Sequence, residues 1–225
     1  MACPPVIALA TFKGGSGKST IAACLATFWQ AQGLAPALVD ADPQATVTQW
    51  YSARDEAGDL KMSTPRSIGI RATVEQLRAN HFPIIIDTAG FKSDLSVEAL
   101  AASQLVLIPV KPSPLDVRVA LETLALVTQL NRSREPGARP LLVRFVLTMT
   151  TPGTVIAKHV RRQMELGRLQ LLSTELGNRV SYAEAALRGL TPTITEPFGA
   201  AAREIAQLAH EIEGLYPSTR KRQGG

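Results

Sequence analysis

Eight residues near the start of the chain constrain its fold more than any other stretch: Lys-Gly-Gly-Ser-Gly-Lys-Ser-Thr, residues 13–20. An apolar run from Val6 to Ala10 precedes them, and a helical pattern from Ile21 to Gln32 follows. A glycine-rich turn between a strand and a helix lets backbone N–H groups surround an anion, and the start of the helix adds partial positive charge. This context predicts a phosphate-binding loop rather than a βα turn without a ligand.

The residue types in this loop indicate separate roles for its members. Lys18 is placed to neutralise the β- and γ-phosphates of a nucleotide, and the Ser19 hydroxyl to bind Mg²⁺. One position departs from the general pattern G-x-x-x-x-G-K-[ST], because Phe12 stands where the first glycine would be and a second lysine, Lys13, follows it. We predict that the nucleotide contacts Lys13, Gly14, Gly15, Ser16, Gly17, Lys18, Ser19 and Thr20.

Three aspartates that follow apolar runs are candidates for metal binding and catalysis. Asp87 ends the run 83–86, and Asp40 and Asp42 follow a short run that begins at Ala37. Because the carboxyl ends of parallel strands form one crevice, these side chains are expected beside the phosphate loop. We interpret Asp87 as a Mg²⁺ ligand, directly or through water, with a cap of the next turn as the alternative. One of Asp40 and Asp42 is expected to face the metal while the other orients a water.

The identity of the base rests on negative evidence. Guanine-specific proteins with such a loop carry an Asn-Lys-x-Asp tetrad that binds the base, and no such tetrad occurs in this sequence. ATP is therefore the expected nucleotide.

Apolar segments alternate with helical patterns along most of the chain. Strands that are apolar throughout and alternate with helices form a parallel sheet that is covered on both faces. We therefore predict a doubly wound α/β fold with a mainly parallel sheet. The expected strands are 6–11, 37–40, 83–87, 105–110, 141–149 and 171–174, with at most a short one near Met62. The expected helices are 19–32, 46–54, 73–79, 115–131, 154–166, 181–188 and 199–214.

The composition is that of one globular domain without a membrane or secretory segment. Of 225 residues, 45% are hydrophobic and 19% charged, and no apolar run approaches the ~20 residues of a membrane span. The only cysteines, Cys3 and Cys24, predict a cytoplasmic protein without disulfides, in which Cys24 is a buried thiol. The net charge of +5 favours an anionic partner. We expect one domain over residues 1–216 and a polar, basic, disordered tail at 217–225.

Four motifs taken together resemble the ParA/MinD family of ATPases with a deviant Walker A loop. They are the loop 13–20, Asp-Ala-Asp-Pro-Gln at 40–44, Ile-Asp-Thr-Ala-Gly at 86–90, and Leu-Ile-Pro-Val-Lys-Pro-Ser-Pro-Leu-Asp at 107–116. The similarity covers residues 6–213, and the Pro-Ser-Pro segment points to the ParA branch. The chain resembles the short form of ParA, which has no N-terminal helix-turn-helix.

The resemblance implies a Mg²⁺-dependent ATPase that dimerises face to face when ATP is bound. Lys13 would then reach the phosphates in the other subunit as a cation supplied in trans, while Lys18 binds the phosphates of its own subunit. Ser19, Asp87 and Asp40 would serve Mg²⁺, with Asp40 also as a supporting switch residue. The expected catalytic residues are Lys13, Lys18 and Asp42, the last as the group that positions the attacking water.

The resemblance also implies that the ATP dimer binds DNA without sequence preference. Residues at i, i+3 and i+4 are neighbours on a helix, so Lys158, Arg161 and Arg162 share one face of the predicted helix 154–166. Phosphate contacts of this kind give salt-dependent affinity with little sequence discrimination. The alternative is an ordinary solvated helix face. The expected DNA contacts are Lys158, Arg161, Arg162, Arg188 and Arg203, with Arg168, Arg220, Lys221 and Arg222 as extensions.

The function implied by the resemblance is partition of a plasmid or chromosome, or positioning of another cargo on the nucleoid. A cargo-bound adaptor of the ParB kind would stimulate hydrolysis and release the dimer from DNA. A MinD-like membrane-associated ATPase is the alternative, but residues 217–225 lack the large apolar side chains of an amphipathic anchor. A metal-cluster carrier on the same fold would need paired cysteines, a pattern that Cys3 and Cys24 do not form.

Overall fold

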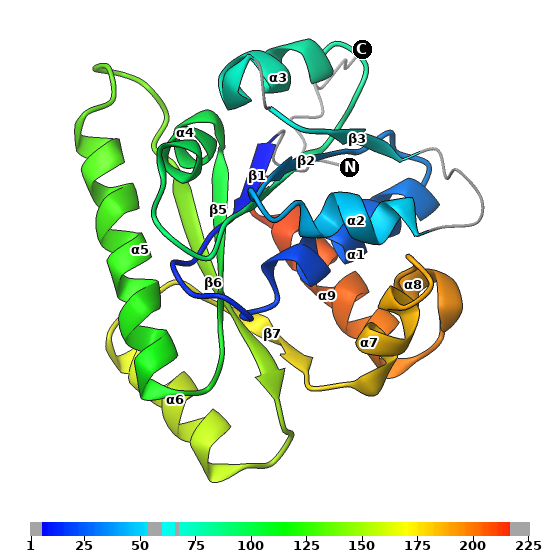
Figure 1. The fold of residues 1–225 in the computed structure, drawn as a ribbon. Coiled ribbons are helices and arrows are strands. Elements are labelled where there is room, and N and C mark those ends of the chain that lie inside the picture. Colours follow the sequence, from blue (N-terminus) through cyan, green and yellow to red (C-terminus); the bar gives the residue numbers. More distant parts are fainter. Residues whose placement is uncertain (1–5, 54–59, 66–67, 217–225) are drawn as a thin grey trace, which may run out of the picture.

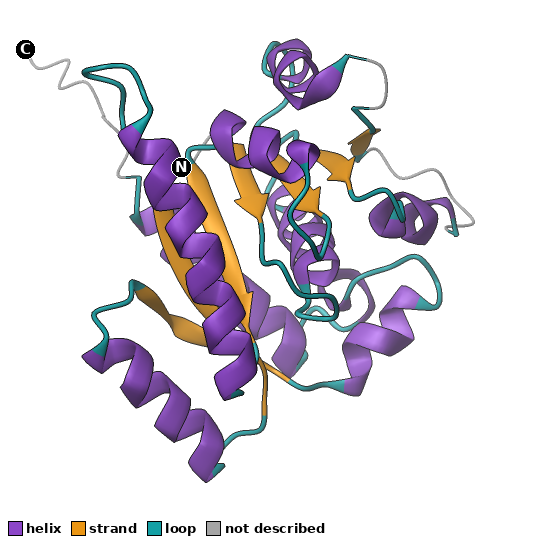
Figure 2. Ribbon diagram, turned by 60° about the vertical axis from the view of Figure 1, so that its left-hand side comes forward, coloured by secondary structure: helices purple, strands orange, loops and turns teal. Residues whose placement is uncertain are grey.

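The computed structural model describes residues 6–53, 60–65 and 68–216, and a parallel sheet with helices on both faces occupies this part of the chain (Figure 1 and Figure 2). The predicted doubly wound α/β fold is confirmed. The strands are β1 (Val6–Leu9), β2 (Ala37–Ala41), β3 (Lys61–Ser63), β4 (Ile84–Thr88), β5 (Leu105–Val110), β6 (Leu142–Thr150) and β7 (Leu171–Gly177). The helices are α1 (Lys18–Ala31), α2 (Thr46–Ser52), α3 (Gly69–Leu77), α4 (Asp94–Ala102), α5 (Pro114–Arg132), α6 (Val155–Leu166), α7 (Val180–Ala186), α8 (Pro192–Thr195) and α9 (Ala200–Gly214).

The order of the strands places β1 at the point of the sheet where the connections between successive strands reverse direction. The order is β3-β2-β4-β1-β5-β6-β7, so β1 lies between β4 and β5 and pairs with both in parallel. Ligands of open α/β sheets bind at the carboxyl ends of the strands beside such a switch point. The register pairs Leu9 with Asp87 and Asp40 with Asp87, which brings both aspartates to the edge where the phosphate loop begins.

The sheet separates two hydrophobic cores. On one face, Ile7 and Leu9 of β1 belong to a buried cluster that includes residues of α1 and α9. On the other face, Val6 and Ala8 of the same strand belong to a cluster with residues of α3, α4, α5 and α6. Side chains of a strand alternate between faces, and here both faces are covered. This explains why the strands are apolar throughout instead of alternating with polar residues.

Four segments differ from the sequence-based expectation. Helix α4 was not predicted, although Ser93 caps it by accepting a hydrogen bond from the Ser96 amide at 3.1 Å. Helix α3 begins at Gly69 rather than at residue 73, because the Glu98 carboxylate of α4 accepts a hydrogen bond from the Arg71 amide in its first turn. Strand β7 continues to Gly177, and the four-residue α8 was also missed. The expected tail 217–225 and Cys3 lie outside the described residues.

Helix α9 ties the first helix of the chain to the last strand. The Trp29 indole of α1 donates to Glu213 at 2.8 Å, and the hydroxyls of Thr27 and Thr191 lie 2.8 Å apart. On the other side of α9, Glu211 accepts hydrogen bonds from the backbone amides of Ser173 and Thr174 in β7. These contacts hold the C-terminal helices against the helix that follows the phosphate loop. Within the described ranges no helix has the length and apolar character needed to cross a membrane.

Replacing Glu211 by Gln should lower the free energy of unfolding by about 1 kcal/mol at pH 7. This value is at the low end for hydrogen bonds to a charged group, because the Glu211 side chain is partly solvated. Partial burial raises the pKa of Glu211, but the hydrogen bonds from Ser173 and Thr174 outweigh it and hold the pKa below 4.5. The contribution of Glu211 to stability is therefore present above pH 4.5, and it is lost as the pH falls through the lower pKa that Glu211 has in the folded protein. Urea denaturation at pH 7 and pH 3 checks this, with the exposed Glu184→Gln as the control. A stability difference of equal size at both pH values would contradict it.

Candidate active site

The phosphate loop connects β1 to α1 and adopts a backbone that glycine permits. Gly15 and Gly17 have φ angles of 69° and 94°, in the left-handed region that other residues rarely adopt. Gly17 is the N-cap of α1, where no side chain accepts a hydrogen bond from the first turn and no acidic residue occupies it. The amide donors at this helix start are therefore available to an anion. On the opposite side, the Thr148 hydroxyl of β6 donates to the Ser16 carbonyl at 3.0 Å and braces the loop.

Lys18 is buried at the base of this loop. Its ammonium donates to the Lys13 carbonyl at 3.1 Å, so the side chain curls back under the turn. Burial lowers the pKa of Lys18, while the negative charges of Asp87 and Asp42 oppose that shift. Lys18, Asp87 and Asp42 thus lie within electrostatic reach of one another, as the sequence predicted for these three residues.

Asp87 is a buried carboxyl group without a hydrogen-bond partner of normal geometry. Its side chain is fully inaccessible, and both oxygens are unpartnered. Burial raises the pKa of Asp87 to about 7, although the nearby Ser19 hydroxyl and Lys18 ammonium favour the ionised form. A buried polar group with no partner is costly, which indicates a site that is completed by a ligand.

Asp40 and Asp42 have different surroundings. Both oxygens of the buried Asp40 accept hydrogen bonds: Oδ2 from the amide and hydroxyl of Thr48 at 2.9 and 2.7 Å, and Oδ1 from the Asp42 amide at 3.2 Å. Asp40 therefore holds the start of α2 in place, a role that the sequence did not indicate. Asp42 is half-buried and accepts one hydrogen bond, from the Gln44 amide. Among the described residues no three acidic, His or Cys side chains form a metal cluster by themselves.

Gly90 touches the phosphate loop directly. A Cβ atom at this position would lie 2.8 Å from the Gly14 nitrogen and 2.9 Å from the Gly14 Cα. The turn after β4 is thus in backbone contact with the turn after β1, and only glycine leaves room for it. The motif Ile-Asp-Thr-Ala-Gly contained this residue, but the sequence alone assigned it no role.

Lys13 does not point to the buried Lys18 but makes an ion pair with Asp116. The two groups lie 2.6 Å apart, with the Lys13 side chain 38% exposed and that of Asp116 6% exposed. Asp116 stands in the first turn of α5, at the end of the Pro-Ser-Pro segment. The sequence predicts that Lys13 acts on the phosphates of a second subunit. In this single chain the lysine is paired with Asp116 of its own subunit.

A cavity of about 270 Å³ adjoins the loop on the side of β6 and β7. Met149, at the end of β6, has a φ angle of 54°, which is uncommon for a residue other than glycine and often marks a functional site. The sequence-based search missed this cavity, yet the rule that ligands bind at the carboxyl ends of strands applies equally to β6 and β7. Its lining includes Gly17, Thr20, Thr148, Met149, Asn178 and Tyr182.

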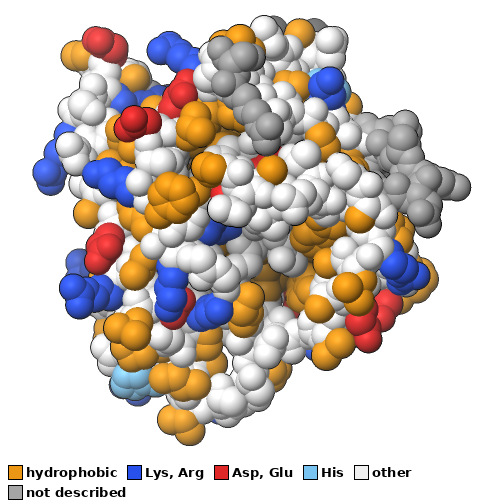
Figure 3. All heavy atoms as spheres, in the orientation of Figure 1, with side chains coloured by type: hydrophobic (Ala, Val, Ile, Leu, Met, Phe, Trp, Pro, Cys, Tyr) orange, Lys and Arg blue, Asp and Glu red, His pale blue; other side chains and the backbone are white. Residues whose placement is uncertain are grey.

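The five expected DNA-contacting residues fall into two groups on opposite faces of the sheet. Lys158 and Arg162 are exposed on α6, whereas Arg188 and Arg203 are exposed at the end of α7 and on α9. Arg161 is not free, because it pairs with Glu175 at 2.6 Å and Glu165 at 3.5 Å. Figure 3 shows Lys and Arg side chains scattered over the visible face rather than gathered in one patch.

The family model of the CobQ/CobB/MinD/ParA nucleotide binding domain matches residues 7–193. The chain belongs to this family. It is an ATPase of the ParA/MinD kind, a group of proteins that act in partition or positioning. It is 27% identical to protein ParA of Rhizobium radiobacter over 184 residues, 80% of this chain and 81% of that protein.

A further relative is similar to the chain in sequence, and a solved structure is similar to it in fold. The chain is 26% identical to maintenance of carboxysome distribution protein A of Halothiobacillus neapolitanus over 211 residues, which are 92% of this chain and 95% of that protein. Its fold matches a putative plasmid partition protein from Borrelia burgdorferi bound to AMPPNP, with a TM-score of 0.71 and 17% identity. That match covers 95% of this chain and 99% of the other.

Replacing Gly90 by Ala should weaken nucleotide binding by about tenfold or more, because the new methyl group forces the backbone of the phosphate loop to move. Isothermal titration with ATP and Mg²⁺ measures the effect. Gly214→Ala is the matched control, since nothing lies within 4 Å of its Cβ position. Unchanged affinity in the Gly90→Ala protein would show that the loop does not need this close contact.

Proposed function

We propose that the chain is a ParA-type partition or positioning ATPase whose ATP-bound form is a dimer that binds DNA without sequence preference. The observation that carries the proposal is the second lysine of the loop. Lys13 is half-exposed and paired with Asp116, so a cation stands at the entrance of the site without being part of its buried base.

ATP fits the described site from phosphate to base. The free amides at the start of α1 and the Lys18 ammonium receive the phosphates. The cavity beside Gly17 and Met149 receives the base. Asp87 and Ser19 suit Mg²⁺, because the two side chains lie close together and, among the described residues, neither Asp87 oxygen has a hydrogen-bond partner of normal geometry. Once bound, Mg²⁺ neutralises phosphate charge, and it favours the ionised form of Asp87.

The positions of Asp40 and Asp42 support a division of labour in hydrolysis. Asp42 is the partly solvated carboxylate near Lys18, so it is the one able to orient a water molecule. Asp40 acts as a positioning residue, since its oxygens are engaged by Thr48 and the Asp42 amide. We therefore propose Asp42 as the water-orienting group and Asp40 as a support for α2.

The pair formed by Lys13 and Asp116 is suited to a change of partner. The Lys13 side chain is partly exposed while Asp116 is buried, so the lysine leaves Asp116 only when a stronger anion offsets the loss of this pair. The phosphates held by a second subunit are such an anion. Phe91, after β4, and Leu115, at the start of α5, are 52% and 67% exposed on the same edge of the sheet. These apolar side chains provide surface that a second copy of the chain would cover.

The surface of α7 and α9 is the favoured DNA interface, because it is connected to the ATP site. The Trp50 indole of α2 donates to the Leu190 carbonyl at 3.0 Å, two residues after Arg188. The same helix is held by Asp40 through Thr48. A change at Asp40 is thus passed through α2 to the segment that carries Arg188. Helix α6, with Lys158 and Arg162, is joined to the site by a different route, because Arg161 pairs with Glu175 of β7, a strand that lines the cavity beside Gly17.

Two kinds of cargo are candidates for this ATPase. The similarity to ParA favours DNA as cargo, with a ParB-like adaptor that stimulates hydrolysis. The similarity to a carboxysome distribution protein over 92% of the chain favours a second candidate, the positioning of a protein cargo on the nucleoid. Both use the same ATPase cycle, and a pull-down with ATP-locked protein distinguishes them.

Replacing Lys13 by Gln should leave ATP binding within about threefold of the parent protein but abolish ATP-dependent dimerisation and hydrolysis, since the trans cation is lost. Asp116→Asn should have the opposite effect, with dimers at lower protein concentration, because the lysine is no longer held in cis. Light scattering after size exclusion, with and without ATP, measures both. Glu122→Gln, on an exposed part of α5, is the control. Normal ATP-dependent dimers in the Lys13→Gln protein would overturn the trans role.

Combined replacement of Arg188 and Arg203 by Glu should weaken ATP-dependent binding to arbitrary duplexes and lower the salt slope by about 2. Mobility shifts at several salt concentrations measure this. The matched variant is Lys158→Glu with Arg162→Glu, on the opposite face. If only the α6 variant loses affinity, DNA lies on that face, and if neither does, these residues are not the DNA contacts. Arg161 is unsuitable for this test, because its replacement also breaks the pair with Glu175.

A further inference from the structure

A second cavity lies at the edge of the sheet opposite the phosphate loop. Its volume is about 720 Å³, within the range of small-molecule sites. It is bounded by α3, the end of α4, the end of α5 and the loop that follows α5. Gln104, at its wall, immediately precedes β5, so the cavity sits at the amino ends of the strands. It is therefore separate from the site that binds ATP.

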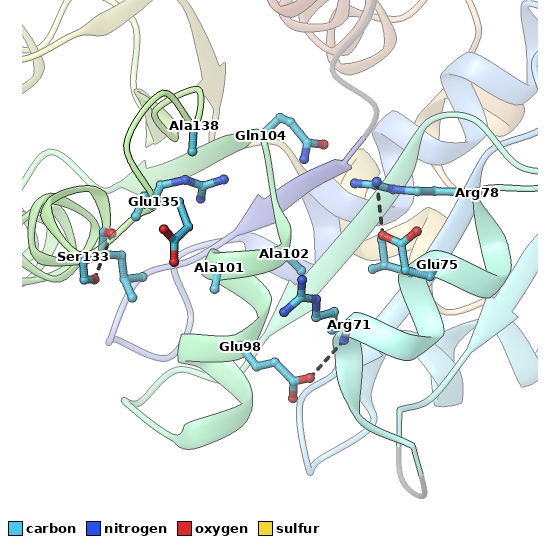
Figure 4. A pocket seen from close by; sticks show the side chains of 13 residues that line it. Arg71, Glu75, Arg78, Glu98, Ala101, Ala102, Gln104, Ser133, Glu135 and Ala138 are labelled. Atoms are coloured by element: carbon cyan, nitrogen blue, oxygen red, sulfur yellow. Dashed lines mark hydrogen bonds and ion pairs between the residues drawn. The ribbon is translucent and has the colours of Figure 1, made fainter.

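The walls of this cavity combine apolar surface with charged groups. Val74, Ala101, Ala102 and Leu130 contribute the apolar part. Figure 4 shows Arg71 and Arg78, from the two ends of α3, and Gln104, which precedes β5, extending toward the same space. A cavity with an apolar wall and a few convergent polar groups is the usual form of a binding site for an organic ligand.

Three arginines and three glutamates line the cavity, and in the described part of the chain only some of them are paired with one another. Arg78 is paired with Glu75 at 3.2 Å. The Glu98 carboxylate is engaged by the Arg71 amide at the start of α3, so it serves the helix end rather than the Arg71 guanidinium. Among the described residues, the guanidinium groups of Arg71 and Arg134 have no carboxylate partner, and Glu135 makes no ion pair with either of them. Arg71 and Arg134 therefore line the cavity without a direct ion pair, and their guanidinium groups are available to a ligand.

Two polar atoms at the wall are buried without a hydrogen-bond partner. They are Nε of Arg134, a donor, and Oε1 of Gln104, an acceptor. Buried polar groups are nearly always hydrogen-bonded, and a guanidinium normally donates to a carboxylate or a phosphate. The Arg134 donor and the Gln104 acceptor both line the cavity without a partner. A ligand that pairs with both needs an oxyanion for Arg134 and an N–H or O–H group for Gln104.

We propose that this cavity binds a small organic anion, with its carboxylate or phosphate group between Arg71 and Arg134 and its apolar body against Val74, Ala101 and Leu130. Gln104 accepts a hydrogen bond from the ligand. The ligand is not the ATP of the phosphate loop, because the two sites lie at opposite ends of the strands. Binding here does not depend on dimerisation or on DNA.

The test uses the full-length protein saturated with ADP and Mg²⁺, so that the phosphate loop is filled. The probes are phenyl phosphate and benzoate, which carry the two oxyanions on one apolar ring, and benzyl alcohol is the neutral control. Amide chemical shifts in ¹H–¹⁵N spectra report binding at Ala101, Gln104 and Ala138. We expect saturable shifts at these amides with phenyl phosphate, benzoate or both, and the stronger probe identifies the preferred oxyanion. Benzyl alcohol should produce much smaller shifts.

Arg134→Gln and Arg71→Gln should each lower the affinity for the more tightly bound probe by about tenfold, as expected for loss of a charge-assisted hydrogen bond. Arg118→Gln is the matched control, because Arg118 lies on α5, is 80% exposed and pairs with Glu122 outside the cavity. Absence of saturable shifts, equal binding of benzyl alcohol, or unchanged affinity in Arg134→Gln would overturn the proposal.

Discussion

The pairing of β1 with β4 is the constraint on which the site depends. It places Asp87, at the end of one strand, beside the loop that follows the other, and so brings a buried carboxyl group next to the buried Lys18. The two charges stabilise each other only in part, since burial shifts the pKa of each toward its neutral form. A site that leaves both Asp87 oxygens without partners is arranged to be completed by a ligand. The same burial strengthens the binding of a cation or phosphate at this site, because opposite charges attract more strongly away from water.

Around this rigid base, the outer groups of the site are held by contacts that can be exchanged. Lys13 is held by Asp116, and Asp40 is held by Thr48 on α2. The first pair joins a partly exposed lysine to a buried aspartate, and the second is a small network at the start of a short helix. Each is connected to another part of the chain: Asp116 to the long α5, and α2 to the segment near Arg188 through Trp50. These connections are the physical basis for proposing that nucleotide binding changes the surfaces used by a second subunit and by DNA.

Sequence patterns predicted the parts of the protein that depend on local chemistry. The glycine-rich turn, the apolar strands and the acidic strand ends led to the right fold and placed Lys18, Asp42 and Asp87 in one crevice. The failures have two causes. Helix α4 has too many small residues for a clear periodic stripe. Helix α3 starts early because Glu98 of α4 caps it, and the Arg161 side chain, predicted to share a face with Lys158 and Arg162, turns toward Glu175 of β7. In these two cases a residue of another segment decided the outcome.

The sequence by itself determined the phosphate loop, the family and the doubly wound class, because these follow from residue types at fixed spacing. Only the tertiary structure decided which carboxylate is free and which is occupied. It showed that Gly90 must be glycine because its backbone meets that of Gly14, and that Lys13 rests on Asp116, 103 residues further along the chain. It also revealed the cavity between α3, α4 and α5, whose open arginines come from segments far apart in the sequence. Spacing along the chain specifies local geometry, whereas charge balance and close contact depend on which segments the fold brings together.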